Sequence, residues 1–129
     1  MKRSLVSVAG AVVVASVALV TWFLGPSTVG PTGRIQLGLV TAAGLLGVVA
    51  GVVDGVGPVR WHHLVGLGHL SFAAAQLYPA PGALSAGDPT GLSTGLLAVG
   101  SGLFVAALGV NWLLAGRYYE LAMLENASG

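Results

Sequence analysis

Residues 92–115 read LSTGLLAVGSGLFVAALGVNWLLA and carry no charged side chain. A helix needs about 20 mostly apolar residues to cross the hydrocarbon core of a bilayer, so this stretch is long enough to do so. Further apolar stretches occupy residues 4–24, 35–53 and 61–78, separated by the glycine, proline and small polar residues that form turns. The sequence therefore predicts an all-α integral membrane protein. We expect a four-transmembrane-helix bundle, running up-down-up-down, with a short tail at residues 116–129.

The composition favours a membrane protein over a soluble one. Of the 129 residues, 55% are hydrophobic and only 7% are charged, and the mean hydropathy is +0.89. A soluble domain usually carries about 25% charged residues. The net charge is only +1 and the basic residues are scattered, so we expect no nucleic-acid partner. Cysteine is absent, which excludes disulfides and cysteine-ligated metals, and the abundance of Ala, Val and Gly favours a prokaryotic source.

Two of the four stretches have a second interpretation. Lys2 and Arg3 followed by an apolar run is how a signal peptide begins, but this run is longer than the roughly 7–15 apolar residues of a cleaved signal. We therefore expect a retained helix. Residues 61–78 contain three histidines and a glutamine, so a re-entrant or interfacial helix is the alternative to a full span. Three spans would place the two termini on opposite sides of the membrane.

The positive charges predict the orientation of the chain in the cell membrane. With four spans, one side holds Lys2, Arg3, Arg60 and Arg117, whereas the other side holds only Arg34. Lys and Arg in short loops prefer the cytoplasmic side. We therefore expect a multi-pass protein with both termini in the cytoplasm.

Small residues form stripes along three of the stretches. Such stripes matter in a bilayer because they let two helix backbones approach closely, whereas burying leucine away from lipid gains little. The glycines expected at helix contacts are Gly44, Gly47, Gly51, Gly95, Gly102 and Gly109. The first stretch offers Ser7, Ala11, Ala15 and Ala18. We expect most of these faces to form contacts within one chain. Some of them can also form contacts between copies in a homo-oligomer.

The chain also contains a candidate internal repeat. Pro31-Thr32-Gly33 precedes the second apolar stretch and Pro89-Thr90-Gly91 precedes the fourth, and several glycines and leucines match at the same spacing. Two similar helical hairpins would follow, an arrangement that occurs in transporters. Chance matches are frequent in a sequence so rich in a few residue types, so the sequence leaves duplication open.

Polar side chains inside the apolar stretches are the candidate functional residues, because polar groups in hydrocarbon are costly and usually face a protein interior or a cavity. These candidates are His69, His62, Gln76, Asn111 and Gln36. His62, His69 and Gln76 share one face of their helix. We expect hydrogen bonds between helices, such as His69 with Asn111 and Gln36 with Gln76.

His69 has three interpretations. The first is a structural hydrogen bond, worth about 0.6 kcal/mol on average inside a membrane. The second is an axial ligand of haem, although all three histidines lie on or beside one helix, so a two-histidine site needs a second subunit. The third is a site for protons or substrate, because histidine side chains change charge near neutral pH.

The remaining polar candidates lie at the predicted membrane boundary. His63 and Arg60, beside His62, are interpreted as an interfacial collar that reaches lipid headgroups, with a metal contact as the alternative. Asp54 stands at a helix end next to glycine, where turn formation explains it.

No catalytic or cofactor motif is present, so we expect no enzyme activity and no metal. The leading hypothesis is a non-enzymatic accessory subunit or a self-associating bundle in the lipid bilayer, alone or in a larger membrane complex. The first alternative is a small transporter or channel that uses the polar face of the third helix. The second alternative is a haem-binding anchor of an electron-transfer complex.

Overall fold

The chain folds almost entirely into helices. The computed structural model describes residues 3–25, 27 and 29–128, and for residues 115–128 it describes the backbone alone. In chain order the helices are α1 (Arg3–Leu24), α2 (Pro31–Val52), α3 (Trp61–Leu77), α4 (Ala80–Ser85) and α5 (Pro89–Ser128). The prediction of an all-α chain is confirmed. Lys2 and the side chain of Arg117, on which the predicted orientation partly depends, lie outside the described residues.

Among the described residues, three helices are long and apolar enough to cross a membrane, namely α1, α2 and the Pro89–Leu114 part of α5. Large apolar side chains on these helices point outward: Trp22 is 84% exposed and Leu97 is 73% exposed. Apolar surface of this extent is rare on soluble monomers. The chain is therefore a membrane protein. The remaining long helix, α3, has 17 residues.

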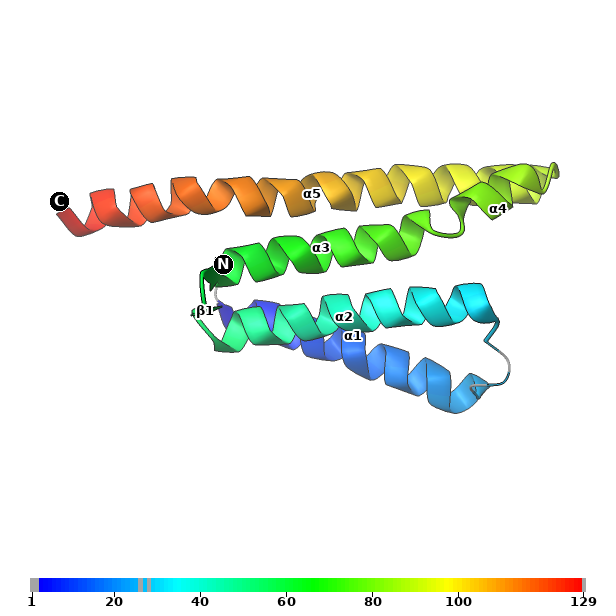
Figure 1. Ribbon diagram of the computed structural model, residues 1–129, viewed down its shortest axis with the longest axis horizontal. Coiled ribbons are helices and arrows are strands. Elements are labelled where there is room, and N and C mark those ends of the chain that lie inside the picture. The colour runs from blue at the N-terminus through cyan, green and yellow to red at the C-terminus, as the bar shows by residue number, and fades with distance from the viewer. Residues whose placement is uncertain (1–2, 26, 28, 129) are drawn as a thin grey trace.

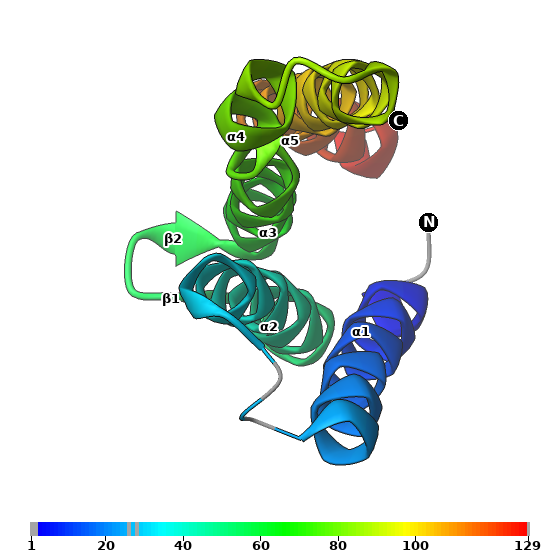
Figure 2. The ribbon, with the colours of Figure 1, turned by 90° about the vertical axis from the view of Figure 1, so that its right-hand side faces the viewer.

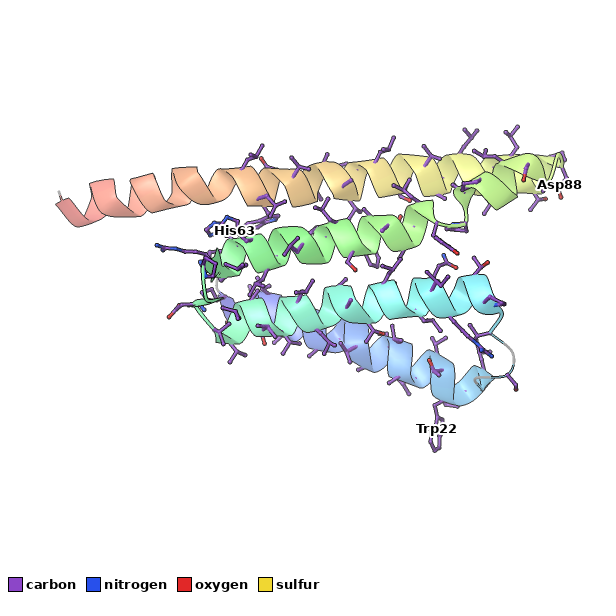
Figure 3. The ribbon with its side chains drawn as sticks, viewed as in Figure 1. Trp22, His63 and Asp88 are labelled. Atoms are coloured by element: carbon purple, nitrogen blue, oxygen red, sulfur yellow. The ribbon has the colours of Figure 1, made fainter. Side chains whose placement is uncertain are left out.

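The helix ends follow from local sequence. α2 begins at Pro31, earlier than expected, because proline suits the first turn of a helix, where its missing N–H is not needed. α5 begins at Pro89, and the backbone N–H of Gly91 donates to the Asp88 carboxylate at 2.8 Å, which caps the helix (Figure 3). α5 then continues to Ser128, so the expected tail is helical, as its Leu, Ala, Met and Glu residues favour.

The loop expected at residues 80–90 contains a short helix, α4. Pro81 lies in its first turn, and Gly87, with φ of +76°, follows its end in a conformation that glycine adopts easily. α4 packs against α5. A Cβ atom added at Gly95 would lie 2.6 Å from Leu84, so Gly95 gives α4 its close approach. The prediction of an irregular loop here is wrong, because a helix this short carries too little periodicity to be recognised in sequence.

A tight hairpin joins α2 to α3. Its two short strands, β1 (Gly55–Val56) and β2 (Val59–Arg60), pair antiparallel, and Gly57 turns the chain between them with φ of +59°. This hairpin brings the end of α2 directly to the start of α3, which fixes α2 and α3 as neighbours.

The long helices stand in a curved row rather than in a closed bundle. Successive long helices run antiparallel, and both ends of the chain lie at the same end of the molecule (Figure 1). The main contacts join α1 to α2, α2 to α3, and α3 to α5, while α1 and α5 stand at the two ends of the row (Figure 2). In lipid no hydrophobic force brings α1 towards α5, so helices pack where small residues let a neighbouring backbone approach closely.

Glycines form the two tightest helix pairs. Gly44 on α2 faces Gly10 and Val14 of α1, and Gly102 on α5 faces Leu77 and the carbonyl of Ala73 on α3. Each glycine thus faces the long helix that precedes its own. Gly44 and Gly102 are matching positions of the candidate repeat, so the two hairpins use equivalent positions for packing.

Candidate functional site

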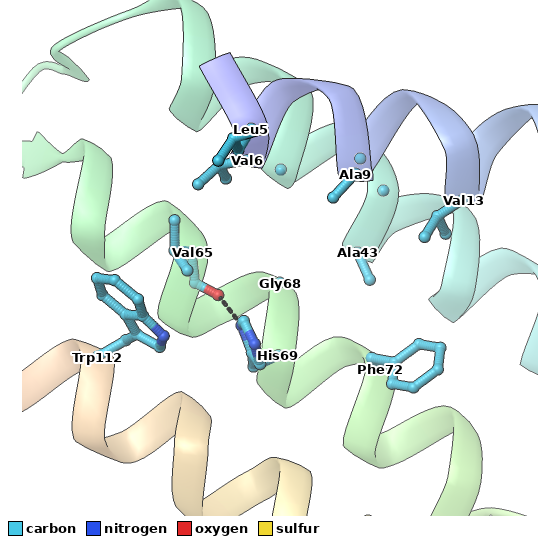
Figure 4. Close-up of a pocket in the computed structure, with 13 residues that line it drawn as sticks. Leu5, Val6, Ala9, Val13, Ala43, Val65, Gly68, His69, Phe72 and Trp112 are labelled. Carbon is cyan, nitrogen blue, oxygen red and sulfur yellow. Dashed lines mark hydrogen bonds between the residues drawn. The ribbon is translucent and has the colours of Figure 1, made fainter. Parts of the chain in front are cut away.

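An apolar cavity of about 610 Å³ lies where α1, α2, α3 and α5 face one another across the curve of the row (Figure 4). Its wall includes Ala9 and Val13 of α1, Ala43 of α2, Phe72 of α3 and Trp112 of α5. The volume lies in the range of small-molecule sites, about 300–1,000 Å³. Four glycines also border the cavity, and each packs against a neighbouring helix, where an added Cβ atom would lie 2.5–3.2 Å from the nearest atom. These are Gly10, Gly44, Gly47 and Gly68.

His69 is the one ionisable residue among the described residues that line this cavity. Its Nδ1 lies 2.8 Å from the backbone carbonyl oxygen of Val65, one turn earlier in α3 (Figure 4). A carbonyl oxygen can only accept, so Nδ1 carries the hydrogen and donates it. In a neutral ring the other nitrogen, Nε2, is then an acceptor. Among the described residues, Nε2 has no hydrogen-bond partner.

The expected pair of His69 with Asn111 is not formed. Asn111 is exposed on α5, whereas Gly109 and Leu113 face α3. Asn111 follows Gly109 by two residues, about 200° around the helix, so it points away from α3. The ring of His69 bonds within its own helix instead.

The two glutamines of the membrane segments do not pair with each other either. The amide of Gln36 donates to the backbone carbonyl of Ala75, at 3.0 Å, one residue before Gln76. Close by, the hydroxyl of Ser71 donates to the carbonyl of Leu39 at 2.8 Å. These two side chains link α2 to α3. Ser71 was missed in the sequence because serine is common in membrane helices and carries no distinctive spacing.

A polar and aromatic cluster closes the end of the row where the chain begins. Arg3 pairs with Asp54, at the end of α2, and its guanidinium lies 6.0 Å from the ring centre of Trp61. The rings of Trp61 and Trp112 meet edge to face with centres 5.9 Å apart. The cluster therefore connects all four long helices. Asp54, interpreted from sequence as a turn residue, also pairs with Arg3 of α1.

The two adjacent histidines belong to this cluster. His62 is buried, only 5% exposed, and its ring centre lies 4.1 Å from that of His63. Nδ1 of His63 accepts the backbone N–H of Arg60 at 3.2 Å, a bond that caps the start of α3 (His63 is labelled in Figure 3). Within the described part of the chain, no three His, Asp or Glu side chains gather as a metal site would require. Of the three histidines, only His69 borders the cavity.

The glycines expected at helix contacts lie at contacts within the chain. Gly44, Gly47 and Gly51 meet α1, and Gly51 lies directly against Ser7. Gly102 and Gly109 meet α3, and Gly95 meets α4. Ser7 also donates to the carbonyl of Val48 at 3.4 Å. By contrast, Ala11, Ala15 and Ala18 of the α1 stripe are exposed.

Comparison with known proteins yields a family and no relative of known activity. No curated protein and no solved structure matches the chain. A match to DUF7994, a family of unknown function, extends over residues 1–125 and thus over almost the whole sequence. The chain belongs to the DUF7994 family.

Proposed function

We propose that this chain is a four-span protein of the cell membrane, with both termini in the cytoplasm. We further propose that it works by associating with membrane helices, chiefly those of its own copies, and not by catalysis. The single observation that carries association is the exposed small-residue face of α1. The glycine stripes of α2 and α5 are occupied within the chain, whereas Ala11, Ala15 and Ala18 are exposed.

The position of α3 supports a fourth span. α3 lies between α2 and α5, both of which are apolar enough to cross a membrane. Its 17 residues extend about 26 Å, close to the roughly 30 Å of hydrocarbon. The charge distribution supports the orientation, because α1 begins at Arg3 and β2 ends at Arg60. The start of α1 and the hairpin both lie at the end of the molecule where the chain begins and ends (Figure 1).

Single cysteines test this topology, because the natural chain has none. We expect a membrane-impermeant maleimide to label Ser27→Cys and Ser85→Cys in intact cells. Val56→Cys, in the exposed hairpin between α2 and α3, should be labelled only after the membrane is permeabilised. If α3 is re-entrant, Ser85→Cys will be protected together with Val56→Cys. If the orientation is inverted, Val56→Cys will be labelled in intact cells, whereas Ser27→Cys and Ser85→Cys will be labelled only after the membrane is permeabilised.

The α1 face has the features of a helix–helix contact in lipid. Ala11, Ala15 and Ala18 follow helical spacing, so a second helix can approach the backbone closely along them. A hollow of about 470 Å³ adjoins this face where α1 and α2 diverge, lined by Ala18, Trp22 and Thr41 among others. Trp22 projects away from the other helices (Figure 3). A second copy would thus find both a flat small-residue surface and a recess for its side chains.

Ala15→Leu should weaken self-association by about tenfold, roughly 1.4 kcal/mol, because the larger side chain holds the partner backbone away. The measurement is energy transfer between differently labelled copies in liposomes, over a series of protein-to-lipid ratios. Ala42→Leu is the matched control, since Ala42 is also exposed but lies on α2. If Ala15→Leu and Ala42→Leu show equal energy transfer, the result will contradict association through α1. A parent protein that stays monomeric at every ratio would contradict self-association itself.

A transporter or channel is the second candidate, and the cavity at His69 favours it. A site for cargo within the membrane needs space and a polar group that faces it, and this cavity supplies both. The test is flux of protons or small amines into liposomes. The candidate predicts flux that His69→Ala abolishes, and it fails if no flux occurs or if His69→Ala leaves the flux unchanged.

A further inference from the structure

The cavity can hold a small molecule but not a packed helix. A helix with its side chains is about 10 Å across, so it would fill the 610 Å³ in less than two turns. A single flexible hydrocarbon chain or a small ring system fits such a space. A small lipid-soluble molecule is therefore the expected occupant, whether or not the chain associates with its own copies.

The wall of the cavity requires an uncharged occupant. Among the described residues that line it there is no Lys, Arg, Asp or Glu, and apart from His69 the lining side chains are aliphatic or aromatic. A charged group placed there would have no opposite charge to balance it, and an unpaired charge in an apolar site is very costly. The body of the occupant must also be apolar, to match residues such as Val13, Val65 and Phe72.

The acceptor nitrogen of His69 determines which kind of polar group the bound molecule must carry. Its Nδ1 hydrogen is already donated to the carbonyl of Val65 at 2.8 Å, which orients the ring and leaves Nε2 as an acceptor. Because an acceptor is satisfied only by a donor, the matching group is an O–H or N–H. Cation and acid groups are excluded by the absence of charge in the wall, so a hydroxyl remains the simplest donor.

We infer that the cavity binds a neutral lipid alcohol, with its apolar body against α1 and α2 and its hydroxyl donating to Nε2 of His69. The bilayer supplies such molecules directly to the cavity. The ligand is bound and not transformed, so His69 acts as a binding residue that selects for the hydroxyl group.

The test uses a matched pair of probes, 9,10-dibromostearyl alcohol and its methyl ether, which differ only in the donor. Bromine quenches tryptophan at short range, and Trp112 borders the cavity. In a Trp22→Phe, Trp61→Phe background Trp112 is the remaining tryptophan. We expect the alcohol to quench Trp112 at about fivefold lower concentration than the ether, the factor that one hydrogen bond provides.

Three variants test two contributions to binding separately, that of the ligand's hydroxyl group and that of the apolar cavity. His69→Phe should make alcohol and ether equal, because it removes the acceptor and keeps an aromatic ring. His69→Gln supplies both an acceptor and a donor, so it should still bind the alcohol but prefer it less strongly over the ether, which shows that the site still folds. Ala9→Leu places bulk in the cavity and should weaken both probes by about tenfold, a loss that partial filling of the pocket explains.

Several results would overturn the inference. Equal quenching by alcohol and ether in the parent protein would remove the role of His69. Quenching that Ala9→Leu leaves unchanged would mean that the probes reach Trp112 from the lipid and not from the cavity. Tighter binding of dibromostearate than of the alcohol would show a charged ligand. A Soret band in the purified protein would identify haem as the occupant instead.

Discussion

Gly10→Val is expected to force α1 away from α2 and to lower the free energy of unfolding by about 2 kcal/mol or more. A Cβ atom at Gly10 would lie 2.5 Å from the carbonyl oxygen of Gly44 and 2.6 Å from the backbone nitrogen of Val48. Both are backbone atoms of a helix, which cannot rotate aside as a side chain can. Relief therefore requires the two helices to separate, with loss of packing along their whole contact.

The measurement is reversible unfolding in mixed micelles by titration with dodecyl sulfate, followed by far-ultraviolet circular dichroism. Gly38→Val is the matched control, because no atom lies within 4 Å of a Cβ added at Gly38 on α2. The control should unfold at nearly the parent midpoint, since valine and glycine differ little in helix propensity, by a few tenths of a kcal/mol. A Gly10→Val midpoint equal to that of the control would contradict the α1–α2 contact described here.

Gly66→Val is expected to act in the same way on the other hairpin, with a loss of about 1–3 kcal/mol. Its added Cβ would lie 2.8 Å from the carbonyl oxygen of Gly109 and 2.7 Å from Leu113. The backbone oxygen cannot yield without moving α5. Displacement of α5 would also part the rings of Trp61 and Trp112, now 5.9 Å apart.

Gly66→Val thus has two readouts, the unfolding midpoint and the near-ultraviolet circular dichroism of the two coupled tryptophans. Gly100→Val provides the control on α5, where an added Cβ meets nothing within 4 Å. We expect the control to keep the tryptophan signal and Gly66→Val to lose it. An unchanged signal in Gly66→Val would show that α3 and α5 do not meet at this glycine.

The helices were predictable because each follows from an apolar run of membrane length with turn-forming residues at its ends. Leu24, followed by a glycine and a proline, is the last residue of α1 in both prediction and structure. What the sequence could not supply was the geometry between helices. Gln36 bonds to a backbone carbonyl on α3, and such a partner depends on how far two helices slide along each other.

The face of α1 that meets α2 also could not be predicted from the sequence. Its stripe was predicted from Ser7, Ala11, Ala15 and Ala18, but only Ser7 meets α2 closely. The rotation of α1 is instead set by Gly10, the single glycine in a long run of Val and Ala. The cavity was equally hidden, because its wall draws on four helices and its volume depends on their curvature.

α5 is longer than a membrane span requires. Its 40 residues extend about 60 Å, twice the roughly 30 Å thickness of hydrocarbon. Trp112 meets Trp61 at the first residue of α3, so the residues from 113 to 128 continue about 24 Å past that level. In a four-span protein with both termini in the cytoplasm, this projecting segment would extend as a helical rod through the headgroup layer and beyond it on the cytosolic side. A water-soluble protein that grips the rod would be held at a fixed height above the bilayer, and any tilt of α5 would reach it as a sideways movement.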